Sequence, residues 1–266
     1  MTTAPEGAPL VRNNVGPLDA LRGRTPARVG LARSGVSMTT ADLLAFQADH
    51  ALARDAVHAA FDRERLAAAV TQAGLDCVSA RSMSGDRGDY LRHPGNGRAL
   101  TEESRAELTS MRSEPPWDVA VIVSDGLSAT AANEHGASVV TPLVEQLRGV
   151  GLTVAPVVIV PFARVGLLDD VGATLGARSA VIVLGERPGL SAPDNLSIYL
   201  EVDPRRGRTD ADRNCVSNIG AHGLAATVAA QQAAALLAEG LRRGVSGTAL
   251  KTEYSPGPRS VDILEQ

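Results

Sequence analysis

The sequence predicts an α/β protein whose main domain is a doubly wound parallel sheet. Three short apolar runs, 118–123, 153–160 and 180–184, are rich in β-branched residues and too short for soluble helices, so we expect them to be buried strands. Helical stretches at about 129–148 and 165–175 separate the three runs. An alternation of strands and helices is typical of a parallel sheet that is covered by helices on both faces.

Polar residues follow each predicted strand. Right-handed crossovers would place the loops 124–128, 161–165 and 185–190 along one edge of the sheet, where open α/β sheets bind their ligands. A fourth apolar run, 196–202, leads to a second polar cluster at 212–219. We expect the two polar clusters on either side of this strand to face one ligand crevice.

The chain divides into four predicted parts. Prolines and glycines without sustained periodicity predict a flexible N-terminal arm, and the sequence Glu114-Pro115-Pro116 predicts a domain boundary. The predicted parts are the arm at 1–30, a mainly helical N-terminal domain at 31–114, the main domain at 115–250 and a tail at 251–266.

Helical spacing of apolar residues predicts further helices before and after the alternating strands and helices of the main domain. In the N-terminal domain we expect helices at about 37–58, 63–73 and 102–112, and two short strands around a glycine turn within 77–92. A final helix at about 223–242 has an alanine- and leucine-rich face that suits packing on the sheet.

Composition excludes several classes of function. A net charge of −4 gives no reason to expect a nucleic-acid or membrane surface, and no apolar run reaches the roughly 20 residues of a membrane helix. Two cysteines do not make a disulfide framework, and the N-terminus lacks the apolar core of a secretory signal, which predicts an intracellular protein. The only lysine, Lys251, follows no glycine loop and is a poor Schiff-base candidate, which argues against P-loop and pyridoxal-phosphate chemistry.

The turn at 124–128 is the first candidate for ligand binding. Ser124, Asp125 and Ser128 lie between a predicted strand and a predicted helix, and their hydroxyl and amide groups suit an anion or a polar edge. The competing interpretation is an ordinary turn whose Asp or Ser caps the helix. The turn is not a GxGxxG fingerprint, so it gives little support to dinucleotide binding.

Other candidate residues have equally plain structural interpretations. His135 could serve acid–base chemistry or belong to a glycine-interrupted helix, and Glu186 could bind a ligand or pair locally with the next arginine. Cys215 could be a nucleophile, but a free cysteine more often forms a small wall. We expect structural or solvent-facing roles for His50 and His58. The residues alone therefore predict a ligand crevice without evident catalytic machinery.

Four motifs, in order along the chain, resemble those of one family. They are VxVSDGLSATA at 121–131, FARVG at 162–166, LGERPGL at 184–190 and DRNCVSNI at 212–219, and FQADHALARDAV at 46–57 fits the same pattern. On these motifs the sequence closely resembles the small (light) subunit of ethanolamine ammonia-lyase. The resemblance covers about residues 25–251.

The resemblance implies a division of labour between two chains. The enzyme converts ethanolamine to acetaldehyde and ammonia with adenosylcobalamin as its radical source. Catalysis is expected in a large subunit with a TIM-barrel fold, and this chain would be the non-catalytic subunit whose Rossmann-like domain binds cobalamin at the interface. The resemblance also implies six copies of each subunit.

The family's cobalamin contacts fall on three residues of this sequence: Val165, Glu186 and Cys215. Glu186 would accept hydrogen bonds from corrin amides, while the other two would supply compact packing. Secondary candidates for lining the site are Ser124, Asp125 and Ser128. The corrin would hold the cobalt, so no metal ligand is expected from the protein, and the chain lacks the DxHxxG motif whose histidine replaces the lower axial base in many cobalamin proteins.

Two further expectations accompany this interpretation. The complex is expected in the cytoplasm, and residence in a bacterial microcompartment is doubtful because the N-terminal arm does not resemble an amphipathic targeting helix. The alternative function is a self-sufficient Rossmann-type enzyme on a nucleotide, with Asp125, His135 or Cys215 catalytic. A third possibility is a regulatory or scaffolding module that has lost cofactor binding.

Overall fold

The computed structural model describes residues 36–221 and 223–250, together with 21, 24, 27–31, 33 and 34. The predicted tail lies outside the described residues, as does most of the predicted N-terminal arm. The chain divides into two compact units, Met1–Ala51 and Leu52–Gln266.

The first unit contains a short antiparallel strand pair and the start of a long helix. Strands β1 (Arg33–Ser34) and β2 (Ser37–Met38) pair with each other, and α2 (Thr40–His58) follows directly. The side chain of Thr39 accepts a hydrogen bond from the backbone N–H of Asp42 at 3.2 Å, which supports the first turn of the helix. The predicted helix at 37–58 is thus confirmed from Thr40 onward.

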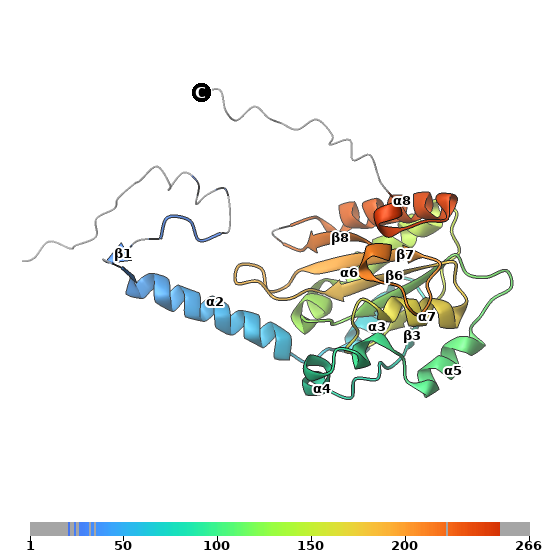
Figure 1. Ribbon diagram of the computed structural model, residues 1–266, viewed down its shortest axis with the longest axis horizontal. Coiled ribbons are helices and arrows are strands. Elements are labelled where there is room, and N and C mark those ends of the chain that lie inside the picture. Colours follow the sequence, from blue (N-terminus) through green and yellow to red (C-terminus); the bar gives the residue numbers. More distant parts are fainter. Residues whose placement is uncertain are drawn as a thin grey trace, which may run out of the picture. The chain divides into compact units, whose positions relative to one another are not determined.

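The second unit is built on a six-stranded sheet with the order β3-β5-β4-β6-β7-β8. Figure 1 shows β6, β7 and β8 as neighbours in this sheet. The first four strands in this order are parallel, and β7 and β8 extend the sheet as antiparallel strands. The prediction of a parallel sheet is therefore right for four strands and wrong for two. The strands are β3 (Cys77–Ser79), β4 (Val119–Ser124), β5 (Val157–Ile159), β6 (Ser179–Gly185), β7 (Leu196–Val202) and β8 (Asn214–Ile219).

Helices cover both faces of the parallel half. On one face, α3 (Arg63–Gln72), α6 (Ala129–Gly149) and α8 (Ala226–Arg243) form a core with the valines of β4 and β6 that point toward these helices. On the other face, α5 (Glu102–Ser110) and α7 (Leu167–Leu175) pack over the alternate side chains. Every residue of β4 and β6 is buried as a result, which explains their unbroken apolar sequences.

The antiparallel half is covered differently. Helix α8 packs on β7 and β8 from one side, and Val216 and Ile219 are buried there. On the opposite side Cys215 and Ser217 are exposed and Tyr199 is half-buried, so the described helices leave this side largely uncovered. Within β8 the exposed Cys215 and Ser217 flank the buried Val216, and this alternation ends at the exposed Asn218.

Three predicted segments differ from the structure. The second strand predicted within 77–92 is instead the short helix α4 (Arg87–Arg92), because Asp86 caps it by accepting from the N–H of Asp89 at 2.7 Å. Helix α6 continues through Gly136, so the glycine-interrupted helix considered for His135 is not formed, and it also continues through Pro142. The polar segment 212–219, expected to follow a strand, itself contains β8.

Residues of the predicted N-terminal domain contribute to the main sheet. Strand β3 pairs with β5 in register, and α3 packs on α6. The compact units divide between Ala51 and Leu52 and not at the boundary expected near Glu114. The reason is that the apolar residues of 66–80 join the same core as the strands that follow.

Strand β8 forms one edge of the sheet. The pairing of β7 with β8 is irregular between Leu196 and Ile198, and Asn218 adopts a left-handed backbone conformation with φ = 59°. The N–H of Leu224 donates to the carbonyl of Asn218 at 2.7 Å, and Leu224 also forms a bridge with Ile219. This end of the edge strand is thus partly covered by its own chain.

Candidate ligand site on the open sheet face

One row of cross-strand neighbours shows where the covered sheet becomes accessible. Ile182 pairs with Tyr199, and Tyr199 pairs with Cys215, so their side chains point to the same face. Ile182 is fully buried in the core beneath α7, Tyr199 is half-buried and Cys215 is exposed. We call the surface formed by Ser197, Tyr199, Cys215 and Ser217 the open face.

Two neighbouring hollows lie on the open face. The larger, of about 390 Å³, is lined by residues that include Glu186, Asn195 and Ser197, and the smaller, of about 240 Å³, by residues that include Val165 and Cys215. Tyr199 lines both hollows. The structure therefore brings together the three residues expected to contact cobalamin, Val165, Glu186 and Cys215, around a tyrosine that the sequence analysis did not single out.

Tyr199 bonds directly to the predicted acceptor. Its hydroxyl donates to Oε1 of Glu186 at 2.7 Å, across the hairpin that joins β6 to β7. Burial, followed by the hydrogen bond to Glu186 and the charge of that carboxylate, raises the pKa of Tyr199 above its ordinary value. The phenol accordingly stays protonated and remains a donor. Its place at the centre of the predicted strand 196–202, between two aliphatic residues, was the one sequence signal that could have revealed it.

Cys215 has the properties of a wall and not those of a nucleophile. Desolvation by the surrounding protein, and then the negative charge of Glu186, raise the pKa of the Cys215 thiol. A nucleophilic cysteine requires the opposite shift, because the thiolate is the reactive form. The thiol thus offers a compact, uncharged surface beside Val165.

The larger hollow contains polar atoms without partners inside the protein. Among the described residues, Asn195 Oδ1 and Ser197 Oγ are buried and have no hydrogen-bond partner, and both residues line the hollow. Buried polar atoms are nearly always bonded in native proteins. Both residues line the hollow that Glu186 also lines.

The hairpin loop that carries Glu186 is fixed at its far end. The N–H of Glu186 donates to the carbonyl of Asn195 at 3.0 Å, and Ser128 Oγ donates to the carbonyl of Pro193 at 2.8 Å. His135 on α6 adds an ion pair, with its Nε2 at 3.0 Å from Oδ2 of Asp194. These contacts attach residues 193–195 to the turn and helix that follow β4.

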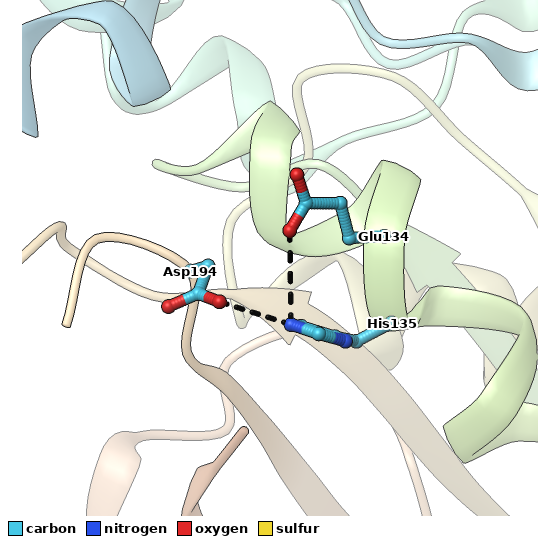
Figure 2. A group of neighbouring side chains, drawn as sticks. All are labelled: Glu134, His135 and Asp194. Carbon is cyan, nitrogen blue, oxygen red and sulfur yellow. Dashed lines mark hydrogen bonds and ion pairs between the residues drawn. The ribbon is translucent and has the colours of Figure 1, made fainter. Parts of the chain in front are cut away.

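Figure 2 shows the imidazole of His135 between two carboxylates. Glu134 lies farther from Nε2, at 3.9 Å, and is exposed. Because its Nε2 already pairs with Asp194, His135 acts as a link between α6 and the hairpin loop.

The secondary candidates do not reach the surface. Ser124, Asp125 and Ser128 are all fully buried. Asp125 Oδ1 accepts from the N–H of Phe162 at 2.7 Å, and Asp125 Oδ2 forms an ion pair with Arg87 at 2.6 Å. Their bonds are internal, so these three residues support the site without lining it.

The buried side chains of Ser124 and Asp125 also determine the path of the loop that carries Val165. Phe162 adopts a left-handed conformation with φ = 59°, which is unusual for a residue other than glycine, and its N–H bond to Asp125 holds it there. Ser124 Oγ accepts from the N–H of Ala163 at 3.0 Å. The helix-cap interpretation of this turn is confirmed for Ser128, which accepts from the N–H of Ala131 at 3.1 Å.

Close backbone contact joins the turn after β4 to the end of β6. A Cβ atom on Gly185 would lie 2.3 Å from the carbonyl oxygens of both Asp125 and Ser128. A Cβ on Gly126, which has φ = 48°, would lie 2.3 Å from the carbonyl oxygen of Gly185. Only glycine permits this approach, and it places Glu186 directly beside the buried turn.

A buried charge cluster anchors the start of β8. Arg213 forms ion pairs with Asp169 at 2.7 Å and with Glu201 at 3.2 Å. Burial, followed by a hydrogen bond and charge repulsion from Asp169, raises the pKa of Glu201 above its ordinary value, and the charge of Arg213 opposes this rise. The cluster connects α7 to the antiparallel strands and so fixes Cys215, two residues after Arg213, relative to the loop before α7.

The remaining candidates lie away from the open face. His50 and His58 are exposed on α2, in agreement with the expectation of solvent-facing roles, and Cys77 is half-buried at the start of β3. In the described part of the chain, none of the helices combines the length and apolar character required to cross a bilayer.

Comparison with known proteins identifies the family. The family model for the ethanolamine ammonia-lyase light chain (EutC) matches residues 16–251. The ethanolamine ammonia-lyase small subunit of Bradyrhizobium diazoefficiens is 51% identical over 243 residues, which cover 91% of this chain and 93% of that protein. The small subunit of Pseudomonas syringae pv. tomato is 42% identical over 248 residues, covering 91% and 86%. The chain therefore belongs to the ethanolamine ammonia-lyase small-subunit family.

Proposed function

We propose that this chain is the cofactor-binding, non-catalytic subunit of an ethanolamine ammonia-lyase and that its open face holds adenosylcobalamin. The observation that carries the proposal is the gathering of Val165, Glu186 and Cys215, from three separate segments, around two neighbouring hollows that share Tyr199. The family's reaction, ethanolamine to acetaldehyde and ammonia, would then take place in a complex that this chain helps to form.

The residues on the open face fit the chemistry of a corrin. A corrin is a broad apolar ring bordered by amide side chains, so its site requires both nonpolar walls and hydrogen-bonding groups. Val165, the ring of Tyr199 and the uncharged thiol of Cys215 supply the walls. Glu186 supplies an acceptor, and the unpartnered buried atoms of Asn195 and Ser197 supply further polar contacts.

The chain's own residues account for binding and orientation. When bound, the cofactor supplies the radical chemistry, through cleavage of its cobalt–carbon bond. Glu186 is already bonded to Tyr199, and the Cys215 thiol stays neutral, so neither is placed as an acid or base. Burial of Asp125 and the ion pair of His135 argue in the same way against the alternative of a self-sufficient nucleotide enzyme, because these groups do not converge with Cys215.

A large catalytic subunit is the proposed partner, since the relatives are named small subunits. We propose that it covers the open face and encloses the cofactor between the two chains, with six copies of each chain in the complex. If the ligand is held between two proteins, each of them supplies only part of the site. The shallow hollows on this chain agree with such an arrangement. The proposed location is the cytoplasm, within or outside a bacterial microcompartment.

Cobalamin retention tests this proposal. Adenosylcobalamin is mixed with this chain, with the large subunit, or with both, and the cofactor that remains after gel filtration is measured by absorbance. We expect retention mainly by the mixture, together with ethanolamine-dependent ammonia release. Equal retention by the large subunit alone would contradict a site on this chain.

A single substitution tests the residue assignment in the assembled complex. Glu186→Ala removes an ionised hydrogen-bond acceptor and is expected to raise the Kd for adenosylcobalamin by about 10- to 100-fold, while the affinity for ethanolamine changes little. Glu239→Ala is the matched control, because this glutamate lies on α8 in an exposed ion pair with Arg242. Unchanged cofactor affinity in Glu186→Ala would contradict the assignment.

A further inference from the structure

The side chain of Glu186 requires something to aim it. Glu186 lies immediately after β6, at the start of a hairpin loop whose later residues, 193–195, carry the contacts that fix it. Among the described residues, Tyr199 is the only one whose side chain bonds the Glu186 carboxylate. The direction of the proposed acceptor is therefore determined by one hydroxyl group.

We propose that Tyr199 is a positioning residue of the cofactor site, whose hydroxyl holds Oε1 of Glu186 so that Oε2 faces an N–H donor of the ligand. This inference rests on the proposed function, because it assigns a role toward the same ligand. Tyr199 would thus act on the ligand indirectly, by orienting the Glu186 side chain that bonds the ligand.

The surroundings of Tyr199 suit it to this role. It occupies the centre of β7 and is paired on both sides, with Ile182 on β6 and with Cys215 on β8. Its ring packs against the core beneath α7 and separates the two hollows. The sheet therefore fixes the hydroxyl, and groups on rigid elements hold a neighbour more precisely than groups on loops.

The chemistry of the pair gives the hydrogen bond one direction. The raised pKa of Tyr199 keeps the phenol protonated through the physiological range, so the hydroxyl donates and the carboxylate accepts. A carboxylate that accepts one internal bond retains lone pairs on its other oxygen. Corrin amides carry the N–H groups that would complete it.

Two simpler roles of Tyr199 would change ligand affinity in different ways when its hydroxyl is removed. If Tyr199 only fills space, removal of its hydroxyl would leave ligand affinity unchanged. If the hydroxyl contacts the ligand directly, its removal would weaken binding whether or not Glu186 is present. A role through Glu186 predicts a loss that depends on the carboxylate, and a double-mutant cycle separates these cases.

The experiment uses the full-length chain assembled with its large subunit and cyanocobalamin as the probe, with the Kd measured for four forms: the parent, Tyr199→Phe, Glu186→Ala and the double variant. We expect Tyr199→Phe to raise the Kd by about 5- to 10-fold in the parent and by less than about 2-fold when Glu186 is already alanine. Ser179→Ala is the hydroxyl-deletion control. Its hydroxyl donates to the carbonyl of Asp118 at the opposite end of β6, so it should leave the Kd unchanged.

Each other outcome has a defined meaning. Equal effects of Tyr199→Phe in both backgrounds, or none in the parent, would overturn the positioning role while leaving the proposed function intact. A normal Kd for Glu186→Ala would reject the proposed site itself. Should Tyr199→Phe fail to assemble, Glu186→Gln provides the test. It keeps an acceptor for the Tyr199 hydroxyl and should retain more affinity than Glu186→Ala, whereas equal losses would overturn the role.

Discussion

The two halves of the central sheet are both built of extended strands, but they differ in how the helices cover them. In the parallel half, helices cover both faces and every residue of β4 and β6 is buried. In the antiparallel half, α8 covers one face and polar residues occupy the other, from Ser197 on β7 to Ser217 on β8. The parallel half thus supplies stability, and the antiparallel half supplies the open face on which we propose that the ligand and the partner bind.

The contrast is clearest within the single row Ile182–Tyr199–Cys215. These side chains are direct neighbours on one face, but their exposure rises from complete burial to open surface. A substitution in this row should therefore affect folding at one end and ligand binding at the other.

Gly185 lies where the parallel half ends and the hairpin begins. Gly185→Ala would place a Cβ atom 2.3 Å from two backbone oxygens, so we expect it to lower the free energy of unfolding by more than about 4 kcal/mol. Gly149→Ala is the control, because a Cβ at that position meets nothing within 4 Å. It should be neutral or stabilise by up to about 1 kcal/mol. Chemical denaturation followed by circular dichroism measures both, and similar losses would contradict the close-approach argument.

Asp170, on α7, connects the two helices α5 and α7, which cover one face of the parallel half. Its buried carboxylate pairs with Arg105 at 2.6 Å and accepts from the N–H of Leu100 at 2.8 Å. Burial alone would raise the pKa of Asp170, but these bonds outweigh burial and lower it. The resulting stabilisation is fully present above the unfolded pKa of about 4 and is lost as the pH falls through the lower folded pKa.

Asp170→Asn should accordingly cost about 3–5 kcal/mol at neutral pH, because it leaves the partly buried Arg105 with only the exposed Glu102, at 3.6 Å, as a counter-charge. The loss of stability on acidification should also become shallower below about pH 4. Glu107→Gln, at an exposed position of α5, is the control. Denaturation midpoints from pH 7 to pH 3 check both expectations, and parallel curves for parent and variant would reject the ion-pair contribution.

The two ends of the row should separate stability from binding. Ile182→Ala creates a cavity beneath α7 and should cost about 2–5 kcal/mol, whereas Cys215→Ser should change stability by less than about 0.5 kcal/mol. Cobalamin retention by the assembled complex should fall only for the Cys215 variant, because a hydroxyl replaces a less polar wall. If Cys215→Ser destabilised the fold as strongly as Ile182→Ala, the division between the halves would be wrong.

The covered half could be predicted from the sequence because burial leaves a local pattern. Continuous β-branched runs predicted β4 and β6, and helical periodicity predicted α6 and α7 within a few residues of their ends. The open half was harder to predict. In β8, only Val216 and Ile219 are buried, and the polar residues around them make the sequence resemble a polar loop.

The site was predictable only where a motif marked it. Resemblance to the family indicated Val165, Glu186 and Cys215, and the structure brings them together. Tyr199 was missed because its partner lies 13 positions away, across a hairpin whose pairing no local pattern specifies. Asp125 was expected on the surface, but its partners come from distant loops, which turn it inward.

The edge strand has a consequence for a chain that must wait for its partner. An unpaired strand edge can recruit a strand from another molecule and begin a growing aggregate. Here the left-handed Asn218 and the bridge from Ile219 to Leu224 cover one end of this edge, and the pairing of β8 with β7 is itself irregular between Leu196 and Ile198. These features shorten the stretch of β8 to which a strand of another copy could add.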